Sequence, residues 1–260
     1  MAKTLVVILD GASFVFCNTF LWFMDNVRWF FHRFTRKLMY IDDIPITPTV
    51  LHCFFTGKYS SEHGVFGFKH LRGGGAILGE YRGKYVWDVL IEEGFKVRVF
   101  NVPVKIPPLY INSKLLLLKW VDAWLIPKKR FLETISKYHR EVLRAVRKPY
   151  DLFVTWYAIP DQACHHFFQT LHSWEAFKTA CFWYDLAFKY ARELVEASKP
   201  KYLLLISDHS FPSDFEKYHI QGTVQHVHLR DATAVTNGKW VPEKPTQVYK
   251  WVLEHVRETK

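Results

Sequence analysis

The sequence predicts an α/β fold, with a doubly wound, mostly parallel sheet and helices on both of its faces. Short apolar segments bounded by turn residues are typical of buried strands. Along this chain such segments alternate with longer amphipathic segments that are typical of helices, and this alternation favours a parallel sheet. A chain of 260 residues is long enough for one large domain and too short for two. We therefore expect a compact, single catalytic domain over residues 1–260.

The expected elements begin with a strand over residues 5–9. The aromatic segment 14–34 is expected to be one mostly buried helix. Threonine is favoured at the N-cap and proline at the first helical position, so Thr47 and Pro48 predict the start of a helix that ends before Gly57. The remaining expected helices span 85–93, 115–124, 130–147, 173–197 and 245–258, and the remaining strands span 96–102, 151–157, 202–206 and 232–236.

Composition and charge limit the classes of protein to which this chain can belong. Hydrophobic residues make up 49% of the chain and aromatic residues 17%, which indicates a substantial core and excludes a disordered protein. The formal net charge of +10 suggests an anionic partner, such as a phosphoester substrate, nucleic acid or an acidic surface. The basic residues are dispersed, so a solvated basic face is the alternative interpretation.

The cysteines and the N-terminus favour a cytoplasmic location. The 4 cysteines show no CxxC spacing and are expected to be reduced thiols. The first apolar run is too short for a signal peptide and for a transmembrane segment. Asparagine and glutamine number only 5 each, a composition that hints at a thermophilic source.

Acidic residues and histidines follow three of the predicted strands. Asp10 ends the first strand, Asp161 follows another and precedes His165 by four positions, and Asp208 and His209 follow a third. Ligands of open α/β sheets bind at the carboxyl ends of the strands. Each residue alone could be a cap, a turn residue or a core histidine. Together, carboxylates and imidazoles at this edge predict a divalent metal site in an enzyme.

Thr47 is the candidate nucleophile. A hydroxyl at the start of a helix lies beside backbone N–H groups that bind phosphate well. Threonine attacks poorly unless a metal or a base lowers the pKa of its hydroxyl, and two metals about 4 Å apart can do so. The alternative is that Thr47 only caps the helix. The late histidines His219, His226 and His228 offer further imidazole ligands.

Four sequence blocks, in order along nearly the whole chain, carry a specific resemblance. They are Ile8-Leu9-Asp10-Gly11, the segment 46–68 with Thr47 ten residues before Gly57, Pro160-Asp161 followed by His165-His166-Phe167, and Ser207-Asp208-His209-Ser210. In this the sequence resembles the type I phosphodiesterases/nucleotide pyrophosphatases of the alkaline phosphatase superfamily.

The resemblance implies a two-metal hydrolase that cleaves phosphodiester or nucleotide pyrophosphate bonds. Thr47 would attack phosphorus and form a phosphothreonine intermediate, which water then hydrolyses. The two divalent ions are expected to be zinc, with manganese as the alternative. One ion would be held by Asp161, His165 and His228, and the other by Asp10, Asp208, His209 and the Thr47 oxygen. His166 and His226 are the alternatives to His165 and His228.

Departures from the family pattern leave rival interpretations. In eukaryotic members of the family an asparagine three residues past the nucleophile helps to hold the phosphoryl oxygens, and in this sequence Val50 occupies that position. Lys69, Arg72 or backbone N–H groups are the candidate substitutes. The substrate is expected to be an anionic phosphoester, with nucleotides and nucleic acid among the candidates. The rival functions are a phosphomonoesterase or phosphotransferase on the same scaffold, and a basic nucleic-acid-binding protein with a vestigial site.

Overall fold

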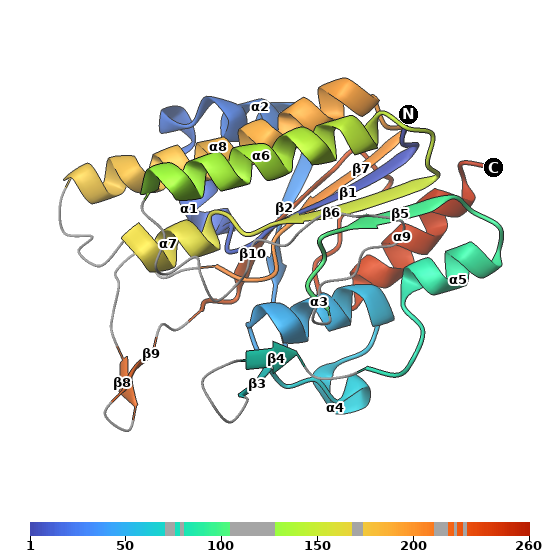
Figure 1. Ribbon diagram of the computed structural model, residues 1–260, viewed down its shortest axis with the longest axis horizontal. Helices are drawn as coiled ribbons and strands as arrows, with labels where there is room; N and C mark the ends of the chain where they lie inside the picture. The colour runs from blue at the N-terminus through green and yellow to red at the C-terminus, as the bar shows by residue number, and fades with distance from the viewer. Residues whose placement is uncertain are drawn as a thin grey trace.

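A six-stranded sheet lies between two layers of helices in the computed structural model (Figure 1). The structure describes residues 1–70, 76–78, 81–104, 128–167, 174–210, 218–220, 223–225 and 228–260. In spatial order the sheet consists of β2 (Thr35–Tyr40), β10 (Asp231–Thr236), β7 (Tyr202–Ile206), β1 (Thr4–Leu9), β6 (Leu152–Tyr157) and β5 (Val97–Phe100).

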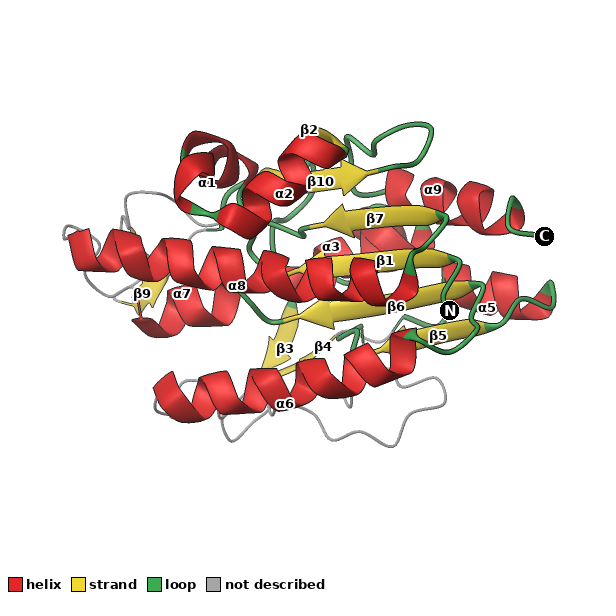
Figure 2. Cartoon of the chain, turned by 90° about the horizontal axis from the view of Figure 1, so that it is seen from above, coloured by secondary structure: helices red, strands yellow, loops and turns green. Residues whose placement is uncertain are grey.

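The sheet is mostly parallel, as the sequence predicts. β1 pairs in parallel with β6 and β7, and β5 pairs in parallel with β6. β10 is the exception, because it runs antiparallel to both β7 and β2 (Figure 2). The carboxyl ends of β7, β1 and β6 therefore lie together at one edge of the sheet.

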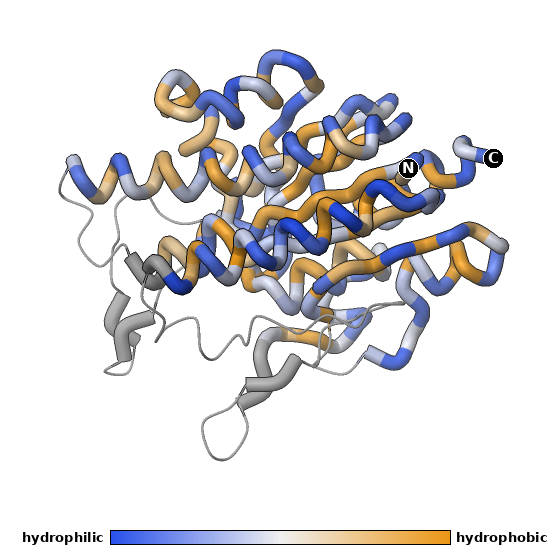
Figure 3. The backbone as a smooth tube through the Cα atoms, turned by 45° about the horizontal axis from the view of Figure 1, so that its top comes forward, coloured by the Kyte–Doolittle hydropathy of each residue, from blue (hydrophilic) through white to orange (hydrophobic). Residues whose placement is uncertain are grey.

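Both faces of the sheet are apolar, because successive strand residues point to opposite sides. Leu5, Val7 and Leu9 of β1 pack into one hydrophobic cluster, whereas Val6 and Ile8 pack into the other. The strands consequently form a continuous hydrophobic centre (Figure 3). The first cluster is covered by α1 (Phe14–Thr19), α2 (Asp25–Arg33), α6 (Lys128–Val146) and α8 (Trp174–Ser198), and the second by α3 (Thr47–Thr56), α5 (Val86–Glu92) and α9 (Gln247–Arg257).

Two predictions for residues 14–40 are wrong. The aromatic segment is not one helix but α1, a short 3-10 helix η1 (Leu21–Phe23) and α2, with Met24 in an extended conformation between the last two. The strand β2 was not predicted. Its burial pattern explains this, since Met39 is the only buried residue of this edge strand and its first three residues, Thr35 to Lys37, are polar.

The helix that begins near Thr47 is confirmed, with a shift of one residue. Ile46 is the N-cap and Thr47 is the first helical residue of α3, so the expected capping role of Thr47 is wrong. The helix ends at Gly57, whose φ of 69° suits a glycine C-cap. All ten residues of α3 are buried, so the packing around the helix fixes the position of its first turn.

The remaining expected helices and strands are confirmed within a few residues of their predicted ends, apart from 115–124, which lies outside the described residues. α7 (Asp161–Phe167) follows β6 directly. Short elements also form in segments expected to be loops: α4 (Ser60–His63), β3 (Phe68–His70), β4 (Ala76–Leu78), β8 (Tyr218–Ile220) and β9 (Thr223–Gln225). Among the described helices, none has the length and apolar character needed to cross a bilayer.

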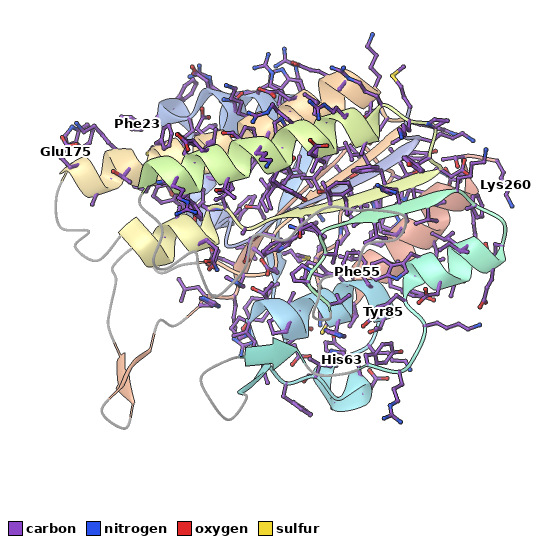
Figure 4. The ribbon with its side chains drawn as sticks, in the orientation of Figure 1. Phe23, Phe55, His63, Tyr85, Glu175 and Lys260 are labelled. Atoms are coloured by element: carbon purple, nitrogen blue, oxygen red, sulfur yellow. The ribbon has the colours of Figure 1, made fainter. Side chains whose placement is uncertain are left out.

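The division of the aromatic segment between core and surface predicts unequal effects of two phenylalanine substitutions. Phe30 is fully buried and contacts Phe188, whereas Phe23 is 61% exposed at the periphery of the molecule (Figure 4). Phe30→Ala should lower the free energy of unfolding by about 3–5 kcal/mol. Phe23→Ala, the matched control, should lower it by less than about 1 kcal/mol. Denaturant unfolding measures both, and equal losses would contradict this packing.

Candidate active site

The register of the parallel strands brings Asp10 and Asp208 together. Ile8 of β1 lies opposite Ile206 of β7, and each aspartate is two residues beyond that pair. Asp10 also continues the ladder toward β6, since its N–H donates to the carbonyl of Tyr157 at 3.0 Å. The side chains of Asp10, Asp208 and the next residue, His209, are fully buried. Strand pairing thus places a charged cluster at the sheet edge.

Gly11 allows Asp161 to approach this cluster. The Asp161 N–H donates to the carbonyl of Asp10 at 2.8 Å, which holds the start of α7 against the loop after β1. Gly11 has a φ of 75°, and a Cβ there would lie 2.9 Å from the Cβ of Asp161. Only glycine fits this conformation and this close approach without strain. The Gly11 N–H also donates to Oδ1 of Asp208 at 3.3 Å.

Thr47 lies beside the first group of candidate metal ligands, which is Asp10, Asp208 and His209. One ligand atom from each member lies within 4.8 Å of the others. Nε2 of His209 is 3.1 Å from Oδ1 of Asp10. Oγ1 of Thr47 is 3.3 Å from the same carboxylate oxygen and 3.1 Å from Nε2 of His209. The hydroxyl therefore lies within hydrogen-bond distance of both neighbours.

A second group of candidate ligands joins Asp161, His209 and His228. Oδ1 of Asp161 is 3.6 Å from Nε2 of His228 and 3.9 Å from Nε2 of His209. The two imidazole rings stack with centroids 3.7 Å apart. Nδ1 of His228 donates to the carbonyl of Pro45 at 3.1 Å, so Nε2 faces Asp161 as a potential ligand atom. Such an outer hydrogen bond is usual for metal-binding histidines.

The carboxylates of the cluster need positive charge. Burial raises the pKa of Asp10 well above its usual value, and the nearby Asp208 and Asp161 raise it further. Burial also raises the pKa of Asp208. Oδ2 of Asp10 and Oδ2 of Asp208 are buried and accept no hydrogen bond from the described residues. Unsatisfied carboxylate oxygens beside imidazoles fit divalent cations such as zinc.

Six of the seven predicted site residues converge at this edge, namely Asp10, Thr47, Asp161, Asp208, His209 and His228. His165 and His166 belong to α7, but their side chains lie outside the described part of the chain, as do His226 and Arg72 and the side chains of Lys69 and His219. The choice between His165 and His166 stays a prediction. Val50 is fully buried among apolar residues of the second cluster, so it belongs to the core.

Two residues that support the site, Tyr184 and Ser207, were not among the predicted site residues. The Tyr184 hydroxyl of α8 donates to the carbonyl of Gly11 at 3.0 Å. Oγ of Ser207 accepts from the N–H of Ala12 at 2.7 Å and donates to the carbonyl of His209 at 2.8 Å. In the sequence Tyr184 resembles any core aromatic residue of an amphipathic helix. Its partner Gly11 lies 173 positions away along the chain.

The fold and the sequence together define a hydrolase of the alkaline phosphatase superfamily. The sequence matches the family model described as type I phosphodiesterase / nucleotide pyrophosphatase over residues 4–259. The chain therefore belongs to this family, as its sequence blocks indicate. No curated protein has a significantly similar sequence.

Solved structures share the fold at low sequence identity. An inactive variant of murine ectonucleotide pyrophosphatase/phosphodiesterase 5 in complex with AMP superposes with a TM-score of 0.70 and 10% identity, over 99% of this chain and 95% of that one. A putative sulfatase from Bacteroides thetaiotaomicron gives 0.69 and 9%, over 98% and 71%. A phosphonoacetate hydrolase from Sinorhizobium meliloti gives 0.54 and 14%, over 81% and 56%.

The raised pKa of Asp208 predicts that Asp208→Asn stabilises the metal-free protein. A carboxyl whose pKa is higher in the folded state than in the unfolded state destabilises the fold at every pH above the unfolded value, which is about 3.9. In the presence of a chelator the substitution should raise the free energy of unfolding by about 0.5–2 kcal/mol at pH 7. The gain should disappear below about pH 4, where both states are protonated.

Asp25→Asn provides the control, because Asp25 pairs with Arg28 while its side chain is 79% exposed. Its effect should stay within about 0.5 kcal/mol at either pH. In the presence of zinc the wild type should have the higher free energy of unfolding and Asp208→Asn the lower. The wild type keeps all of its ligands and binds the ion more tightly, and tighter binding stabilises the folded state more. Destabilisation of the metal-free protein by Asp208→Asn would contradict the charge repulsion described above.

Proposed function

We propose that this chain hydrolyses phosphodiester or nucleotide pyrophosphate bonds, with Thr47 as nucleophile and two divalent ions as cofactors. The observation that carries the proposal is the position of the Thr47 hydroxyl. It is 3.3 Å from Oδ1 of Asp10 and 3.1 Å from Nε2 of His209, within a buried set of carboxylates and imidazoles. Family membership supports the same reaction class.

The start of α3 supplies the phosphate-binding environment. The first backbone N–H groups of a helix lack intrahelical partners, and the helix dipole is positive there. Thr47 is the first residue of this turn, so its hydroxyl and an anionic phosphoryl group would meet at the same place. Asp10 and His209 orient the hydroxyl. A carboxylate oxygen of Asp10 would accept its proton, because Nε2 of His209 would be bound to the ion. The buried packing of α3 keeps the attacking oxygen in position.

Asp10, Asp208 and His209 would hold one ion, and Asp161 and His228, together with His165, would hold the other. Bound at these ligands, divalent ions would lower the pKa of the Thr47 hydroxyl and neutralise charge on the phosphoryl oxygens. The carboxylates would offset the cost of burying the charge of the ions, because opposite charges in a buried site stabilise each other. The His228 contact with Pro45 keeps this imidazole in the required tautomer.

Two observations favour a nucleotide or a related phosphodiester as the substrate class. The murine neighbour, which shares the fold, was solved with AMP. The net charge of +10 also favours an anionic substrate. The solved structures that share the fold also include a phosphonoacetate hydrolase and a putative sulfatase, so the fold alone does not select a phosphodiester. A phosphomonoesterase is therefore the second candidate.

The Thr47→Ala variant tests the nucleophile. We expect turnover of bis(p-nitrophenyl) phosphate to fall by about 1,000-fold or more, since the loss of a nucleophile removes the covalent route. Zinc binding, measured by calorimetry, should weaken far less, because the aspartates and histidines remain. Thr47→Ser is the matched control and should keep a measurable rate, since it retains the hydroxyl.

Full turnover by Thr47→Ala would exclude Thr47 as nucleophile. The rate ratio between bis(p-nitrophenyl) phosphate and p-nitrophenyl phosphate decides between the two esterases, and a preference for the monoester would favour the second candidate. A protein that binds fewer than two ions and turns over neither ester, but binds nucleic acid with an affinity that falls steeply with salt, would contradict the hydrolase altogether.

A further inference from the structure

Asp231, the first residue of β10, joins the loop after β1 to the loop after β7. Its Oδ2 accepts a hydrogen bond from the Ser13 hydroxyl at 2.6 Å and from the Val15 N–H at 3.2 Å. Its Oδ1 accepts a hydrogen bond from the Ser210 hydroxyl. Ser13 lies three residues beyond Asp10, and Ser210 directly follows His209. One carboxylate therefore holds both loops that carry the first group of candidate ligands.

Backbone hydrogen bonds around Asp231 join the same two loops to β10. The N–H of Thr233 donates to the carbonyl of Ala12 at 3.2 Å, and the carbonyl of Thr233 accepts from the N–H of Ser207 at 2.9 Å. Ser210 and Leu229 exchange two hydrogen bonds, at 3.1 and 2.8 Å. These bonds set the direction of each loop, and the Asp231 side chain links the two loops directly.

The residues just before Asp231 bind the loop that leads into α3. Nη1 of Arg230 donates to the carbonyls of Ile41 and Asp43, at 2.7 and 2.8 Å. Nδ1 of His228 donates to the carbonyl of Pro45 at 3.1 Å. Residues 228–231 thus contact three of the segments that carry site residues. Within this group, Asp231 is the residue whose side chain contacts both the loop after Asp10 and the loop after His209.

We propose that Asp231 is a positioning residue that sets the separation of Asp10 from Asp208 and His209, and thereby the affinity of this group for a divalent ion. Asp231 contacts hydroxyl and backbone groups of the two loops, so it acts on the ion only through the ligands. The loops meet beyond Ile8 and Ile206, the last pair of β1 and β7, so hydrogen bonds outside the ladder add to strand pairing in setting their distance. The proposal rests on the proposed function, because it presumes that these ligands bind a metal.

The test compares zinc affinity in four proteins: wild type, Asp231→Ala, Asp231→Asn and Thr236→Val. Asp231→Ala removes both acceptors, and its dissociation constant should rise by about 10–100-fold, as for other outer-shell partners of metal ligands. Asp231→Asn keeps one side-chain acceptor oxygen, so its affinity should lie between those of the wild type and Asp231→Ala. Titration against a chelating dye measures all four constants.

Thr236→Val is the matched control. Thr236 ends the same strand, and its hydroxyl donates to the carbonyl of Leu203, far along β10 from the site. The substitution should lower the melting temperature while leaving zinc affinity within about 2-fold of the wild type, since it alters stability alone. A double variant, Ser13→Ala with Ser210→Ala, keeps Asp231 but removes its two hydroxyl donors. The double variant should show the same loss of zinc affinity as Asp231→Ala. It replaces Asp231→Ala in the test if that variant does not fold.

Wild-type affinity in both Asp231→Ala and the double variant would overturn the positioning role while leaving the proposed function intact. Equal affinity losses in Asp231→Ala and Thr236→Val would also overturn it, because general destabilisation would then explain both. If the wild type itself binds no zinc or manganese, the proposed function fails and the positioning role fails with it. Recovery of kcat by Asp231→Ala at saturating zinc would support a role in affinity alone.

Discussion

The burial of three carboxylates at one edge of the sheet is the constraint on which the rest of the structure depends. Asp10, Asp161 and Asp208 come from different segments, and their proximity opposes ionisation. A fold with this arrangement needs rigid strands to hold the acids, and either protons or a cation must neutralise them. The apolar layers on both faces of β1 provide the rigidity. The imidazoles of His209 and His228 complete the ligand set.

The proposed role of Thr47 depends on the same buried carboxylates. Its hydroxyl contacts a carboxylate and an imidazole that belong to the charged edge. The helix that carries it is buried along its whole length, so the hydroxyl has little freedom to move away. The start of a buried helix and the ends of rigid strands are independent parts of the chain. Because they meet within about one hydrogen-bond length, the arrangement favours the proposed role of Thr47 over packing alone.

Much of the fold and of the site could be predicted because the signals are local. β1, β6 and β7 are continuous apolar runs, and the acids and histidines follow them directly in sequence. β2 escaped prediction because it is an edge strand with mostly exposed side chains. The supporting contacts of Asp231 and Tyr184 could not be predicted either. The contacts of Asp231 with Ser13 and of Tyr184 with Gly11 join residues about 170 or more positions apart, and the contact of Asp231 with Ser210 spans 21 positions. The geometry of all three exists only once the sheet has formed.

The central claim is that the buried edge binds two divalent ions, and a crystal structure of the protein grown with zinc tests it most directly. Anomalous scattering at the zinc edge should show two peaks. We expect one peak between Asp10, Asp208 and His209, and the other beside Asp161 and His228. The absence of zinc from this edge, with the three aspartates still buried and in contact, would contradict the account.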